Sequence, residues 1–334
     1  MPAMRTAIPE LICPAGTPAA LRAAVEAGAD AVYLGFRDAT NARNFPGLNF
    51  DEGEFREGVD FAHTRACKVF VAINTFPPAG RSGPWHEAVD RAADGGADAV
   101  ILADVGLLDY AATRHPDLRR HLSVQASASN MDAIRFYQEA FGVARVVLPR
   151  VLTLAEITAL NRQATVETEI FAFGGLCVMA EGRCALSSYT TGQSPNTNGV
   201  CSPASHVRYE QRDGLLISRL GEFIIDRVGD GAPAGYPTLC KGRFVADGCT
   251  GHLFEEPTSL DAIGMLPKLV ATGTRALKIE GRQRGRSYVA RVVATFRQAL
   301  DALANGETPP DNGALDALTE GQRKTTGAYL KSWQ

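Results

Sequence analysis

The stretch Val69-Phe-Val-Ala-Ile-Asn74 is an unbroken apolar run that ends at an amide side chain. A helix-like segment follows, and then Ala97-Asp-Ala-Val-Ile-Leu-Ala103, a second run of nearly the same character. Continuous apolar runs are typical of strands that are buried on both faces of a parallel sheet. These two stretches therefore predict parallel strands joined by a crossover helix.

The same alternation extends along most of the chain. Helix-like segments separate the runs: Thr17–Ala27 starts with a capping threonine and a proline, and Thr153 with Glu156 has a capping-box pattern. Eight strands alternating with helices predict an α/β fold, a (βα)8 barrel. An open doubly wound sheet is the competing fold, but no Gly-x-Gly-x-x-Gly turn follows the first strand. The other six runs are Glu10–Cys13, Ala31–Gly35, Leu122–Ala126, Arg145–Leu148, Thr168–Phe173 and Ala276–Ile279.

Composition narrows the class of protein further. The 334 residues include 34 Lys+Arg and 37 Asp+Glu, a net charge of −3, and 45% are hydrophobic. This balance is typical of a globular protein and makes nucleic acid an unlikely partner, although a local basic patch could still bind RNA. No apolar run reaches the roughly 18 residues that a membrane helix needs, and the start lacks a signal-peptide pattern. We therefore expect a cytoplasmic protein without a membrane span.

The regular spacing of strands and helices is interrupted once, between the seventh and the eighth strand. We expect a barrel domain from residues 9–173 plus 271–304, and an inserted region at 174–270. The polar residues 305–334 form a C-terminal extension. A barrel loop as long as this insertion is uncommon and usually functional.

The insertion holds four of the seven cysteines, in the pattern C-x6-C-x16-C-x38-C. Thiolates are soft ligands that select zinc or iron–sulfur, and zinc sites usually contain a tight C-x2-4-C pair, which this pattern lacks. The wide spacing favours a larger cluster, although buried structural thiols remain the alternative. Cys67 is expected to pack in the core, and little supports Cys13 as a ligand. Cys249 is the best substitute if one of the four is not a ligand. The four cysteines of the pattern are Cys177, Cys184, Cys201 and Cys240.

A long motif surrounds the first two of these cysteines. Glu169-Ile-Phe-Ala-Phe-Gly-Gly-Leu-Cys177-Val-Met-Ala-Glu-Gly-Arg-Cys184-Ala-Leu-Ser187 resembles the signature of the collagenase-like peptidase family U32. The one departure is Gly175, where that family usually has Ser or Ala. Other stretches resemble one branch of the family, the UbiU branch: Cys13–Gly16, Asn41–Phe45, Ser194–Thr197, Tyr236–Arg243 and Lys278–Arg282.

The resemblance implies a specific function. Proteins of the UbiU branch are iron–sulfur proteins of O2-independent ubiquinone biosynthesis, and with a UbiV-like paralogue they form a heterodimer that hydroxylates the ring of a quinone precursor. It also implies that a 4Fe-4S cluster is held by Cys177, Cys184, Cys201 and Cys240. Other branches hydroxylate RNA bases, which is the alternative. A peptidase is less favoured, because the chain has neither a His-Glu-x-x-His nor a Gly-x-Ser-x-Gly motif.

Chemistry in a (βα)8 barrel occurs where the strands end. Glu280, Arg282, Arg43 and Gln125 follow strands and are the candidate catalytic residues; Glu280 is expected to be a salt-bridge partner or a proton acceptor. The cysteine-bearing loop leaves the seventh strand at the same rim, so we expect it to cover the pocket. Cations at the start of the last helix predict a site for a carboxylate or phosphate, with a solvated turn as the alternative: Arg282, Arg284 and Arg286, together with Arg43, Arg150 and Lys278. The family resemblance implies that such a site could take an anionic hydroxyl donor such as prephenate.

Overall fold

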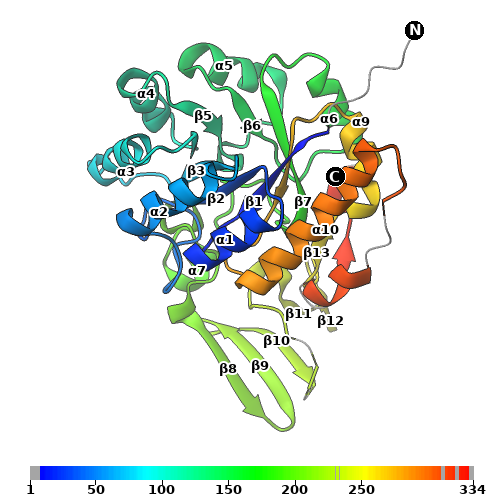
Figure 1. The fold of residues 1–334 in the computed structure, drawn as a ribbon. Helices are drawn as coiled ribbons and strands as arrows, with labels where there is room; N and C mark the ends of the chain where they lie inside the picture. Colours follow the sequence, from blue (N-terminus) through cyan, green and yellow to red (C-terminus); the bar gives the residue numbers. More distant parts are fainter. Residues whose placement is uncertain (1–7, 230, 233, 310–312, 320–322, 331–334) are drawn as a thin grey trace.

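The structure is a computed structural model that describes residues 8–229, 231–232, 234–309, 313–319 and 323–330. Within these residues, eight parallel strands close into a barrel with helices outside it (Figure 1). The ring closes because β14 (Ala276–Ile279) pairs with both β1 (Glu10–Pro14) and β7 (Glu167–Gly175). The predicted (βα)8 barrel is confirmed. The other barrel strands are β2 (Ala31–Leu34), β3 (Lys68–Ile73), β4 (Ala99–Leu102), β5 (Arg119–Leu122) and β6 (Arg145–Val147).

The helices around the barrel begin where the sequence places their caps. The Thr17 hydroxyl accepts a hydrogen bond from the Ala20 amide at 3.2 Å, and Thr153 forms the predicted capping box with Glu156. None of the helices in the described part of the chain has both the length and the apolar character needed to cross a membrane. The barrel helices are α1 (Pro18–Glu26), α2 (Glu52–His63), α3 (Gly83–Asp94), α4 (Val105–Arg114), α5 (Met131–Phe141), α6 (Leu154–Asn161), α9 (Leu266–Ala271) and α10 (Arg286–Ala304).

The predicted strand at Leu122–Ala126 is displaced. The strand β5 ends at Leu122, and the next residues form the 3-10 helix η1 (Val124–Ala126). The Ser123 hydroxyl accepts a hydrogen bond from the Gln125 amide and starts that turn. The prediction was wrong because β5 begins with two arginines, which conceal a strand when only apolar runs are sought.

The insertion between β7 and β14 is built mainly from antiparallel pairs of strands. Its three-stranded sheet projects away from the barrel (Figure 1). The strand β13 (Ser259–Asp261) then returns to pair with β7, and β15 (Lys324–Thr325) of the C-terminal segment pairs with β13. The remaining strands are β8 (Val207–Arg212), β9 (Leu215–Leu220), β10 (Phe223–Gly229), β11 (Arg243–Ala246) and β12 (Cys249–His252).

Short helices complete the insertion and the C-terminal segment. Tyr329 in the last of them is buried, and its hydroxyl donates a hydrogen bond to the Phe171 carbonyl of β7. The described end of the chain is therefore packed against the barrel. The helices are α7 (Leu186–Thr191), α8 (Pro195–Asn198), η2 (Ala204–His206), η3 (Leu239–Lys241), η4 (Ile263–Met265), η5 (Gly313–Leu318) and η7 (Gly327–Leu330).

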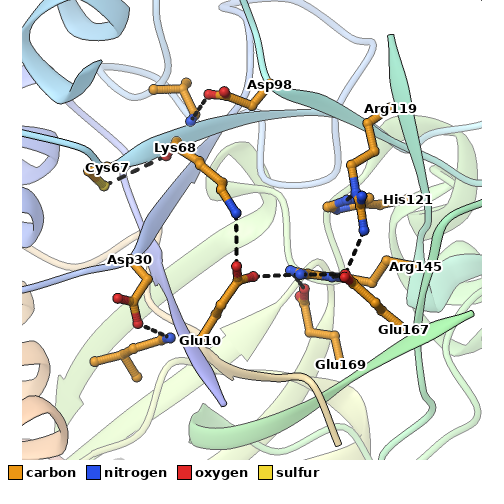
Figure 2. A network of polar contacts seen from close by, with 12 residues as sticks. Glu10, Asp30, Cys67, Lys68, Asp98, Arg119, His121, Arg145, Glu167 and Glu169 are labelled. Atoms are coloured by element: carbon orange, nitrogen blue, oxygen red, sulfur yellow. Dashed lines mark hydrogen bonds and ion pairs between the residues drawn. The ribbon is translucent and has the colours of Figure 1, made fainter. Parts of the chain in front are cut away.

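Charged side chains fill the barrel at the end where the strands begin (Figure 2). The Arg145 side chain is 3% exposed and pairs with Glu10 at 2.5 Å, Glu167 at 2.7 Å and Glu169 at 3.4 Å. Lys278 pairs with the other oxygen of Glu169 at 2.7 Å. Burial of a charge is costly unless the charge is paired, so each member of this network depends on the others.

We predict that Arg145→Met lowers the free energy of unfolding by about 3–5 kcal/mol, because it leaves Glu169 buried with one cation fewer. The matched control is Lys68→Met, which removes a half-exposed partner of Glu10 and should cost at most about 1 kcal/mol. Urea unfolding followed by circular dichroism measures both. Equal losses for the two variants would contradict the network's role.

Candidate site at the mouth of the barrel

The mouth of the barrel is the end where its strands finish. Three of the residues predicted to line it are linked by ion pairs. One oxygen of Glu280, just after β14, accepts from Arg43 at 2.8 Å, and the other pairs with Arg150, just after β6. Arg150 also pairs with Glu181, which belongs to the cysteine-bearing loop. Its guanidinium carbon lies 3.4 Å from the centre of the Phe171 ring. Arg150 therefore joins the barrel to the loop.

The two carboxylates of this chain have opposite electrostatic environments. Burial would raise the pKa of Glu280, but Arg150 and Arg43 outweigh it and lower the pKa from 4.5 to about 2. Burial raises the pKa of Glu181, and Arg150 opposes only part of that effect. Glu280 is therefore ionised and bound at both oxygens, which favours its role as a salt-bridge partner over that of a proton acceptor.

Arg282 turns inward and contacts the backbone of the loop after β2. It donates to the Asn41 amide oxygen at 3.1 Å and to the Ala42 carbonyl, and burial lowers its pKa to about 10. Arg284 and Arg286, in contrast, are exposed at the start of α10. The structure thus does not bring these three arginines together, and Lys278 is bound to Glu169.

The cysteine-bearing loop packs closely on the mouth, as its exit from β7 predicts. Gly182 has φ +77°, and a Cβ there would lie 1.9 Å from the Gln125 carbonyl oxygen, so only glycine fits. The Ser127 hydroxyl donates to the Glu181 carbonyl. Further along, the Arg43 amide donates to the Gly199 carbonyl at 3.1 Å. Gln125 and Arg43 thus meet the loop through their backbones.

The four predicted thiols are neighbours around Cys201. Burial raises the pKa of Cys177 to about 12, and the pKa values of Cys184 and Cys240 are also raised by burial. The nearby Cys201 thiol adds to the pKa rise of all three, and it is itself exposed. Cys201 is therefore close enough to each of the other three thiols to act on it electrostatically.

Four thiols are the type of donor set that a 4Fe-4S cluster would require. In the part of the chain that the structure describes, no three His, Cys, Asp or Glu side chains are grouped to hold a metal ion. A 4Fe-4S cluster does not need such a group, because each of its four thiolates binds a different iron. Cys13 and Cys67 lie in the core, and Cys249 is exposed on the β11–β12 hairpin.

Two buried residues of this site were absent from the sequence-based candidates, Glu181 and Lys241. Lys241 donates to the Thr258 carbonyl at 3.4 Å and lies close enough to Glu280 to lower the pKa of that carboxyl, after the larger effects of burial, Arg150 and Arg43. Glu181 stands inside the cysteine motif, four residues after Cys177. Its place between two cysteines was a signal that could have been used.

The fold and the site define a (βα)8 barrel with a cysteine-bearing loop over its mouth, and comparison with known proteins gives its family. The model of Peptidase family U32 matches residues 16–332. A tRNA hydroxylation protein P of Haemophilus influenzae is 31% identical over 97% of this chain and 74% of its own length. The 23S rRNA 5-hydroxycytidine C2501 synthase of Escherichia coli is 31% identical over 88% of this chain and 39% of its own length.

A solved structure, that of the U32 peptidase Mk0906, has a TM-score of 0.42 at 18% identity and covers 52% of this chain and 72% of its own. The match to the family model, which includes almost the whole chain, together with the first relative, decides the assignment. The chain belongs to Peptidase family U32.

We predict a defined pH dependence for Glu280. Because its pKa is lowered, its ionised form stabilises the fold above about pH 4.5, and that contribution is lost as the pH falls toward 2. Wild type should lose about 3 kcal/mol more than Glu280→Gln over this range. Urea unfolding at a series of pH values measures the difference. Parallel pH profiles of the two proteins would show that the ion pairs contribute nothing.

Proposed function

We propose that this chain is an iron–sulfur protein that takes part in the O2-independent hydroxylation of a ubiquinone precursor. In this proposal Cys177, Cys184, Cys201 and Cys240 hold a 4Fe-4S cluster, and a UbiV-like paralogue is the partner in a heterodimer. When bound, the cluster would supply electron transfer or polarisation of a hydroxyl donor beside the mouth of the barrel.

The observation that carries the proposal is the gathering of four thiols around Cys201 above a cationic mouth. Burial raises the pKa of Cys177 to about 12, so a free thiolate is unfavourable there. A thiolate that binds iron would need nearby positive charge to offset its own negative charge. A thiolate-bound cluster is an anion. The ion pairs beside these thiols, taken together with Lys241, have an excess of cations, with Arg43, Arg150 and Lys241 against Glu181 and Glu280.

The relatives support hydroxylation as the class of reaction. Two of them are named for hydroxylation of tRNA and for synthesis of a hydroxylated cytidine in rRNA. A peptidase is disfavoured by the site itself, because Glu280 is bound to two arginines and the four thiols are the cluster ligands of the proposal. We therefore place this chain with the hydroxylation branches of the family.

Hydroxylation of an RNA base is the second candidate, and the names of the relatives favour it. We rank it second because the stretches outside the shared signature, such as Ser194–Thr197 and Tyr236–Arg243, resemble the UbiU branch. The net charge of −3 also supports a substrate other than a polyanion.

We predict that protein prepared without oxygen is brown, absorbs broadly near 400 nm and holds about four irons per chain. Cys177→Ala and Cys240→Ala should lose iron and stability, since the ligands tie the insertion to the barrel. Cys13→Ala and Cys67→Ala are the matched controls and should keep their iron. Stoichiometric zinc without iron would contradict the cluster.

We predict that deletion of the gene abolishes ubiquinone only in cells grown without oxygen, and that wild type restores it whereas Cys184→Ala does not. Quinone extraction and chromatography measure this. Normal ubiquinone together with a missing hydroxyl on an RNA base would move the assignment to the second candidate.

In the same strain, tagged protein should co-purify with the paralogue, and separate elution at micromolar concentration would count against the heterodimer.

A further inference from the structure

The structure assigns a ligand-binding role to Glu181. We propose that its second carboxylate oxygen accepts a hydrogen bond from a hydroxyl group of the molecule bound at the mouth of the barrel. The choice of a phenol as the test molecule rests on the proposed function, whereas the unfilled acceptor does not.

The Glu181 carboxylate is fixed on one side only. Its Oε1 pairs with Arg150, and its own backbone carbonyl accepts from the Ser127 hydroxyl. Gly182, the next residue, is pressed against the Gln125 carbonyl. The side chain is 5% exposed and its position is therefore set by the barrel on one side and by the loop on the other.

The second carboxylate oxygen of Glu181 is an unfilled hydrogen-bond acceptor. Glu181 Oε2 is buried and has no hydrogen-bond partner within the residues that the structure describes. A buried carboxylate oxygen without a donor is costly, and native proteins fill such positions with a protein group, a water molecule or a ligand. Glu280, in contrast, has both of its oxygens paired. Of the two carboxylates that pair with Arg150, only Glu181, in the cysteine-bearing loop, has an acceptor that the described residues leave unfilled.

The surroundings select a neutral donor. A fully ionised carboxylate or phosphate has no hydrogen to donate to Glu181 Oε2, and a further cation would be repelled by Arg150 and Arg43. After burial, Glu181 is the largest influence on the pKa of Cys177, so the acceptor lies beside the proposed cluster. A phenolic or alcoholic hydroxyl donates a hydrogen bond without a charge and meets these conditions.

The test compares 2-prenylphenol with its methyl ether, which has the same shape but cannot donate. Binding of each to the full-length chain, prepared without oxygen, is measured by ligand-observed NMR titration. Wild type should bind the phenol about ten- to one-hundred-fold more tightly, the range expected for a hydrogen bond to a charged group.

Glu181→Gln gives a directional control. Arg150 requires an oxygen at the Oε1 position, so the amide nitrogen must occupy the Oε2 position and becomes a donor. The preference for the phenol should then disappear. Glu222→Gln, on the exposed turn between β9 and β10, makes the same chemical change and should keep the preference.

Equal binding of the two compounds by wild type would overturn the inference, and it would mean that water alone fills this position. This comparison needs no variant, so it decides the matter even if Glu181→Gln folds poorly. A preference that persists in Glu181→Gln protein with unchanged iron content and circular dichroism would also overturn it. Normal ubiquinone in the deletion strain, with the phenol preference intact, would remove the proposed substrate and leave the hydroxyl site.

Discussion

The arrangement of the site depends on one buried cation, Arg150. It follows β6, stacks on Phe171 of β7, and pairs with Glu280 after β14 and with Glu181 in the cysteine loop. Removal of this guanidinium would leave two buried carboxylates with less compensation, which is far more costly than the loss of a surface pair. One side chain therefore sets the positions of two adjoining barrel strands relative to the loop that carries the thiols.

Much of the fold could be predicted from the sequence because the signals are local. Seven of the eight barrel strands were found from apolar runs, and the caps at Thr17 and Thr153 mark helix starts through hydrogen bonds within one turn. The strand β5 was displaced in the prediction because Arg119, Arg120 and His121 precede its one apolar residue. His121 is nevertheless buried, packs against Phe70 and accepts from Arg119. Only the closed barrel shows that charged residues can be interior ones.

The site was less predictable, because the sequence does not show in which direction a side chain points. Arg282, Arg284 and Arg286 are close in sequence, but the chain turns there and only the first points inward. Glu181, conversely, looks like a loop residue and becomes buried because Gly182 lets the loop approach Gln125 closely. The motif contains only Cys177 and Cys184, and Cys240 approaches Cys201 only because the chain returns from the projecting sheet.

The barrel has one network of charged residues at each end, and the two networks have different roles. At the end where the strands begin, Glu169 pairs with Arg145 (Figure 2) and also with Lys278, so its buried charge is compensated. At the end where the strands finish, Arg150 pairs with both Glu280 and Glu181. Of these two carboxylates, Glu181 has one oxygen without a hydrogen-bond donor among the described residues. In a (βα)8 barrel the first end contributes mainly stability and the second holds the site. The unfilled acceptor thus lies at the end of the barrel where a ligand would bind, beside Cys177.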